Sequence, residues 1–123
     1  VNPAGGVVRP SPAAPGTTFY THLGTTGCTG NPVTGETVSC ARPDRMDFSL
    51  SSFNVATQKV VLDLAALYTG TNLNEDLGGA AGCMSGATDP ECNAIFKVLA
   101  LDLTTGKPIN GGSGQTLFRV EGK

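Results

Sequence analysis

The stretch GCMSGATDPEC, residues 82–92, decides the fold because it holds two of the four cysteines and the start of a helix. Asp at position 89 and Pro at position 90 are the residue types that favour a helix cap and the first helical position. Beyond them, apolar side chains recur at helical spacing on one face; they are Cys92, Ile95, Phe96 and Leu99. The sequence therefore predicts a short helix that starts at Asp89–Pro90 and ends near residues 100–102.

The four cysteines predict two local disulfides, Cys28–Cys40 and Cys83–Cys92, among the three pairings that four cysteines allow. Each would close a short loop and contribute about 3 kcal/mol in the chain-entropy model. A structural zinc site is the alternative, but zinc knuckles place two residues between cysteines, and these spacings are far longer. Disulfides indicate an oxidising compartment, so we expect a periplasmic or extracellular protein.

Working outward, the remaining segments are mostly of strand type. Four segments are rich in β-branched or alternating apolar residues: 17–23, 45–53, 58–62 and 115–121. Residues 45–53 are expected to pair with 58–62 across a turn at 54–57, and Asp63 is expected to cap a short helix over 64–68. The fold class predicted is mainly β: an antiparallel β-sandwich-like domain with one or two short helices and two local disulfides.

The composition limits both domain organisation and function. The chain has 123 residues with 17 Gly and 8 Pro, no Trp, one His and a net charge of −2. Residues 1–16 hold four prolines and predict an arm or linker, and residues 17–123 predict a single disulfide-stabilised β-rich domain. The acidic balance excludes a strongly basic nucleic-acid binder, and the apolar runs are too short for a transmembrane span.

His22 is the single candidate metal ligand that the side-chain types suggest, and imidazole suits copper. The run Asn72, Asn74, Asp76 has the rhythm of a calcium loop. However, an EF-hand needs glycine at its sixth position and a carboxylate at its twelfth, where this chain has Leu77 and Cys83. These two departures argue against calcium as a cofactor. No nucleophile–base pair is present, so we name no catalytic residue and expect a protein that is not an enzyme.

Five runs in this order resemble the C-terminal half of the MbnP-like family, secreted proteins related to the methanobactin-associated periplasmic protein. They are HLGTTGC (22–28), DLAAL (63–67), GCMSG (82–86), DPEC (89–92) and QTLFRV (115–120). The resemblance covers roughly residues 18–121. It implies a secreted, β-rich, disulfide-bonded protein that is not itself an enzyme.

The resemblance further implies copper binding through histidines and a kynurenine, an oxidised tryptophan made by a di-haem peroxidase-like partner. His22 is the one position here that could contribute to such a site. The family's N-terminal half, with its Trp-rich and His-bearing segment, is not represented in the sequence. Because the chain holds no Trp, the modified residue cannot form in this chain.

Two functions follow as expectations. The first is a secreted, non-enzymatic copper-binding or copper-handling protein of MbnP-like type, with His22 as one ligand. The second is a structural or assembly subunit of the cell surface or of an extracellular filament, with no intact metal site. The expected partners are the missing N-terminal half or neighbouring copies, bound through an exposed strand edge or through residues 1–16.

Overall fold

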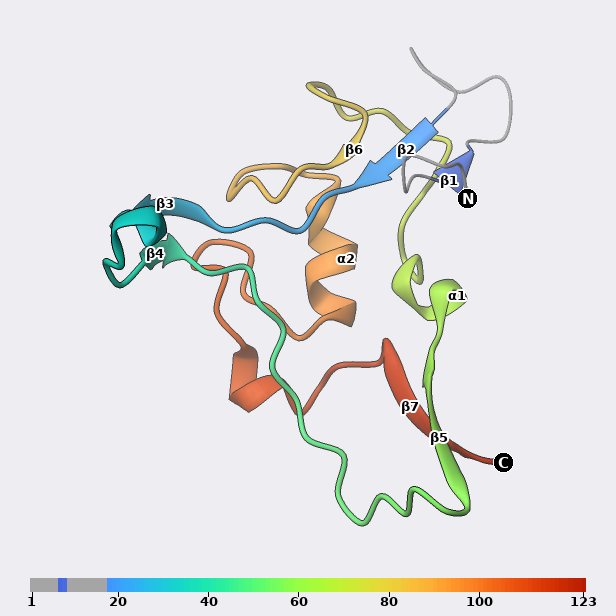
Figure 1. The fold of residues 1–123 in the computed structure, drawn as a ribbon. Helices are drawn as coiled ribbons and strands as arrows, with labels where there is room; N and C mark the ends of the chain where they lie inside the picture. The colour runs from blue at the N-terminus through green and yellow to red at the C-terminus, as the bar shows by residue number, and fades with distance from the viewer. Residues whose placement is uncertain (1–6, 9–17) are drawn as a thin grey trace.

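The computed structural model describes residues 7–8 and 18–123 (Figure 1). The strands are β1 (Val7–Val8), β2 (Thr18–Thr21), β3 (Thr26–Thr29), β4 (Ser39–Arg42), β5 (Gln58–Leu62), β6 (Gly82–Cys83) and β7 (Phe118–Gly122). The α-helices are α1 (Leu64–Leu67) and α2 (Cys92–Val98), and 3-10 turns lie at Pro32–Thr34 and Ile109–Gly112. The predicted class, mainly strands with two short helices and two disulfides, is confirmed. Apart from β1, the predicted arm over 1–16 lies outside the described residues.

The strands of the described residues form three small sheets rather than one large one. β2 lies between β1 and β6, antiparallel to the first and parallel to the second. β3 and β4 form one antiparallel pair, and β5 and β7 form another. The parallel pairing of β2 with β6 brings the first predicted strand, residues 17–23, beside Gly82 and Cys83.

The core gathers around α2, in the middle of the molecule (Figure 1). The predicted buried face is confirmed, since Cys92, Ile95, Phe96 and Leu99 are all at most 4 % exposed. The helix begins at Cys92 rather than at Asp89–Pro90. The preceding residues form a tight turn instead, in which the Cys92 N–H donates to the Asp89 carbonyl at 3.2 Å.

Both predicted disulfides are present. Cys83–Cys92 is fully buried and joins β6 to the start of α2. Cys28–Cys40 links directly opposed residues of β3 and β4. The first fixes the core, and the second fixes a hairpin at the surface.

The predicted strand over 45–53 is wrong: in the described structure this segment belongs to no strand, and β5 pairs with β7 instead. The alternation that suggested a strand is real, because Met46 and Phe48 are half-buried while their neighbours are exposed. Phe48 stacks on Phe118 with ring centroids 4.9 Å apart. The backbone leaves the strand region at both ends of the segment, with φ of 43° at Asp44 and 58° at Ser52.

The predicted helix cap at Asp63 and the predicted last strand are both present. Asp63 caps α1 by accepting from the Ala66 N–H at 3.0 Å. The last strand begins at Phe118, three residues later than expected, after the buried Leu117. Among the described helices, none has the length and apolar character needed to cross a bilayer.

Candidate functional site

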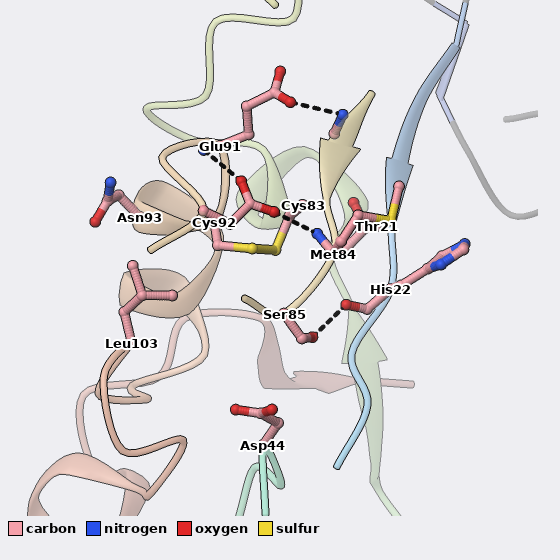
Figure 2. The surroundings of a disulfide bond; sticks show 12 residues. Thr21, His22, Asp44, Cys83, Met84, Ser85, Glu91, Cys92, Asn93 and Leu103 are labelled. Atoms are coloured by element: carbon pink, nitrogen blue, oxygen red, sulfur yellow. Dashed lines mark hydrogen bonds between the residues drawn. A yellow bond between two sulfur atoms is a disulfide. The ribbon is translucent and has the colours of Figure 1, made fainter. Parts of the chain in front are cut away.

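His22, the predicted metal ligand, directly follows β2 and has an exposed side chain. Its imidazole meets the Tyr20 ring edge-on at a centroid distance of 5.8 Å. Figure 2 shows the imidazole pointing away from the neighbouring disulfide. An ion in solution can therefore reach the ring, which offers one ligand nitrogen.

The backbone that carries this ring is tied on both sides to the 82–86 loop. The His22 N–H donates to the Cys83 carbonyl at 2.8 Å. The Ser85 hydroxyl donates to the His22 carbonyl and accepts from the Gly24 N–H at 3.1 Å. Ser85 is 2 % exposed and adopts a φ of 61°, a conformation that L-residues rarely take. The exposed His22 imidazole is therefore attached to backbone that is hydrogen-bonded beside the buried disulfide.

An ion pair between Arg42 and the buried Asp44 supports the same loop, and Figure 2 shows the Asp44 carboxylate below Ser85 in the view. The Arg42 guanidinium donates to the Ser85 carbonyl and, at 2.7 Å, to the Leu103 carbonyl, and it lies 3.2 Å from Asp44 Oδ1. The Asp44 side chain is fully buried against Gly106. Burial raises the pKa of Asp44 above its ordinary value, and the Arg42 charge opposes this. Arg42 therefore joins three distant segments at one point.

Sequence reasoning did not find Ser85, Arg42 or Asp44. Arg42 lies 43 residues from Ser85 and 61 from Leu103, so no spacing rule links them. The one available signal was weak: an Arg and an Asp two residues apart at the end of a predicted loop.

Cys83, Asp89 and Cys92 form the one group of three or more possible metal-ligand residues within residues 7–8 and 18–123, with ligand atoms within 4.8 Å of one another. In this structure the two sulfurs are bonded to each other. The Asp89 carboxylate accepts from the backbone N–H groups of Met84 at 2.8 Å and Glu91 at 3.0 Å. The possible ligand atoms of this group are therefore engaged in the disulfide and in the turn before α2. His22 does not belong to the group.

The polar loop before β6 uses its side chains on its own backbone. Asn72 Oδ1 accepts from the Asn74 N–H at 3.1 Å, and Asp76 Oδ1 accepts from the Gly78 N–H at 2.9 Å. Such contacts stabilise turns. They account for the Asn/Asp rhythm that resembles a calcium loop in the sequence.

Comparison with known proteins gives one informative relative. No protein-family model matches the chain, and no curated protein matches it. Among solved structures, the chain is similar to MbnP from Methylosinus trichosporium, with a TM-score of 0.75 and 38 % sequence identity. The match covers 99 % of this chain and 44 % of that chain. The predicted resemblance to an MbnP-like protein is confirmed, and the chain spans less than half of MbnP's length, consistent with the expected C-terminal half.

Proposed function

From the premise that this chain is MbnP-like along nearly its whole length, we propose that it is the part of a secreted copper-handling protein that supplies His22 as one ligand. The observation that carries the proposal is the placement of His22. Its ring is exposed, while its backbone is held by Cys83 and Ser85. A fixed backbone lowers the entropy lost when a side chain binds a ligand.

One imidazole does not make a tight copper site, so the remaining ligands must come from outside this chain, which holds no other histidine. The resemblance to the MbnP-like family implies further histidines and a kynurenine, with a di-haem peroxidase-like partner that makes the kynurenine. Since this chain has no Trp, any such residue also lies outside it. In this proposal the chain supplies a ligand and a scaffold and performs no catalysis.

Export follows from the same premise. Two disulfides form in oxidising compartments and are rare where thiols are kept reduced. We propose that the protein works in the periplasm or outside the cell. Alkylation of free thiols in intact cells, followed by mass analysis, should find all four cysteines protected.

The copper proposal is tested by titrating the purified chain with Cu²⁺ and recording its electron paramagnetic resonance spectrum. We expect one weakly bound ion with nitrogen hyperfine structure that His22→Ala removes. Tyr20→Phe is the matched control, because it changes the side chain in contact with His22 and leaves the imidazole in place. A spectrum that His22→Ala leaves unchanged, or no bound copper at all, would overturn the proposal.

The second candidate function is a structural or assembly subunit. The observation that favours it is the number of open sheet edges, since two of the three described sheets contain only two strands. Open edges are templates for pairing with another chain. Light scattering on the purified protein tests this function: a concentration-dependent oligomer supports it, and a monomer at all concentrations counts against it.

A further inference from the structure

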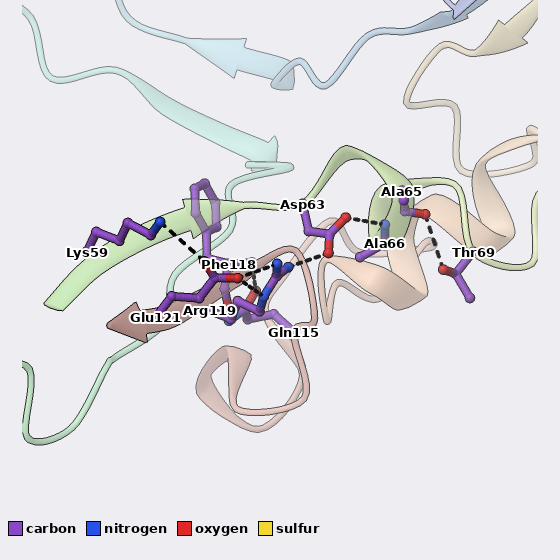
Figure 3. A network of polar contacts seen from close by, with 9 residues as sticks. All are labelled: Lys59, Asp63, Ala65, Ala66, Thr69, Gln115, Phe118, Arg119 and Glu121. Carbon is purple, nitrogen blue, oxygen red and sulfur yellow. Dashed lines mark hydrogen bonds and ion pairs between the residues drawn. The ribbon is translucent and has the colours of Figure 1, made fainter. Parts of the chain in front are cut away.

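The ribbon formed by β5 and β7 has two unlike faces. The register places Val60 opposite Val120 and Leu62 opposite Phe118, so these four apolar side chains share one face. The opposite face carries an ion-pair network (Figure 3). Its members are Lys59, Glu121, Arg119 and Asp63. The charged face is satisfied by its own contacts, whereas the apolar face needs a cover.

That cover is incomplete. Phe118 stacks on Phe48 and packs against the core, which closes one end of the face. On β5, however, Val60 is 46 % exposed and Leu62 is 48 % exposed. Leu64, just beyond the strand, is 49 % exposed. The open part of the apolar face therefore follows β5 and not β7.

The outer edge of β5 is open at the same two residues. The Asp63 N–H donates to the Leu117 carbonyl at 2.8 Å, and the Lys123 N–H donates to the Thr57 carbonyl at 3.0 Å. Hydrogen-bonded and non-hydrogen-bonded pairs alternate along an antiparallel ladder, so Val60 and Leu62 direct their backbone N–H and C=O groups away from β7. No strand among the described residues pairs with this edge.

Backbone and side chains thus point to the same missing element. A two-stranded ribbon alone is at best marginally stable in water, and an open edge readily accepts another strand. More than half of MbnP lies outside the match to this chain. We propose that the outer edge of β5 pairs with a strand from that remaining portion of the MbnP-like fold, and that apolar side chains of this strand cover Val60 and Leu62.

The proposal rests on the likeness to MbnP and not on copper, so its test is run with metal-free protein in the presence of a chelator. The test uses a chimera in which this chain replaces the matched part of Methylosinus trichosporium MbnP. Amide hydrogen exchange is compared between the chimera and the chain alone. In the chain alone, the Val60 and Leu62 amides should exchange fast and the Val61 amide slowly.

In the chimera, we expect exchange at Val60 and Leu62 to slow by a factor of roughly 100 or more, as for amides that join a stable ladder. The Val120 amide, on the outer edge of β7, should remain fast, which locates the new strand on β5. Leu62→Lys should lower the melting temperature of the chimera by several degrees more than that of the chain alone. Val33→Lys is the matched control, because Val33 is 91 % exposed and lies in the β3–β4 turn.

Fast exchange at Val60 and Leu62 in the chimera would overturn the proposal. A chimera that does not fold under conditions where the chain alone folds would count against it too, because the two parts must be compatible. Slow exchange at both amides in the chain alone, together with a dimer by light scattering, would show that a second copy covers the edge. His22→Ala should leave all these results unchanged, which separates this proposal from the copper proposal.

Discussion

Ser85 anchors the His22 backbone with a single buried hydroxyl, so its removal is the most direct test of that anchor. Ser85→Ala leaves the His22 carbonyl and the Gly24 N–H without this partner. We expect a loss of about 1–3 kcal/mol in the free energy of unfolding, measured by urea denaturation. Thr29→Ala is the control, since that hydroxyl makes one exposed contact at 3.4 Å and its loss should be within about 0.5 kcal/mol. Equal losses for the two variants would contradict the anchoring role.

Asp44 predicts a pH dependence of stability with a defined sign. Burial raises its pKa above the ordinary value of 3.8 despite Arg42. The folded state binds the proton of the Asp44 carboxyl group more tightly than the unfolded state does. The contribution of Asp44 to the free energy of unfolding is therefore fully present below pH 3.8 and is lost as pH rises through the raised pKa. Asp44→Asn stays neutral, so it should gain stability relative to the parent protein as pH rises.

The measurement for Asp44 is the difference in urea midpoint between Asp44→Asn and the parent across acidic to neutral pH. Asp63, Asp102 and Glu121 have lowered pKa values, caused chiefly by hydrogen bonds from Ala66, Thr105 and Arg119 respectively. They act with the opposite sign, since their stabilisation is lost at low pH, and they cancel in the difference. A difference that does not change with pH, or one that falls as pH rises, would refute the assignment to Asp44.

At the scale of elements, the pairing of β2 with β6 depends on one glycine. Gly82 has a φ of 91°, and a Cβ there would collide with the backbone of Tyr20 on the paired strand. Gly82→Ala should therefore cost at least about 1–3 kcal/mol and weaken the pairing. Gly24→Ala is the matched control, because nothing lies within 4 Å of its added Cβ. Thermal unfolding of both variants checks this, and a Gly82→Ala protein as stable as the control would disprove it.

The elements also show what sequence reasoning can reach. The α1 cap at Asp63 and the buried face of α2 were predictable, because each depends on residues within one or two helical turns. The pairing of β5 was not, because alternation over 45–53 reports which side chains are buried and not which backbone makes the ladder. Phe48 meets the ribbon through its ring, which explains how the burial prediction held while the strand assignment failed.

For the whole molecule, the site was only partly predictable. The exposed His22 came from residue type and resemblance, and both disulfides came from spacing. The hydrogen bonds from Arg42 to the carbonyls of Ser85 and Leu103 were not predictable, because they join segments that no local sequence pattern connects. The exposure of Val60 and Leu62 could not be predicted either. A strand has the same sequence pattern whether or not another element covers its apolar face.

The two disulfides should contribute unequally, although the loops they close are similar, at separations of 12 and 9 residues. The chain-entropy model gives about 3 kcal/mol for either loop. Cys83 and Cys92 are both fully buried beside α2, whereas Cys28 is exposed in the hairpin. Replacing a buried pair also leaves a cavity in the core, which adds a further cost.

We therefore expect Cys83→Ala with Cys92→Ala to lower the free energy of unfolding by more than Cys28→Ala with Cys40→Ala, measured under non-reducing conditions. Replacing the buried pair should also weaken the hydrogen bond that holds His22. The Cys83 carbonyl accepts from the His22 N–H, and its position depends on the disulfide. Faster exchange of the His22 amide in that variant alone would show the coupling. Equal destabilisation by the two pairs would mean that only loop closure matters and that the core adds nothing to the Cys83–Cys92 link.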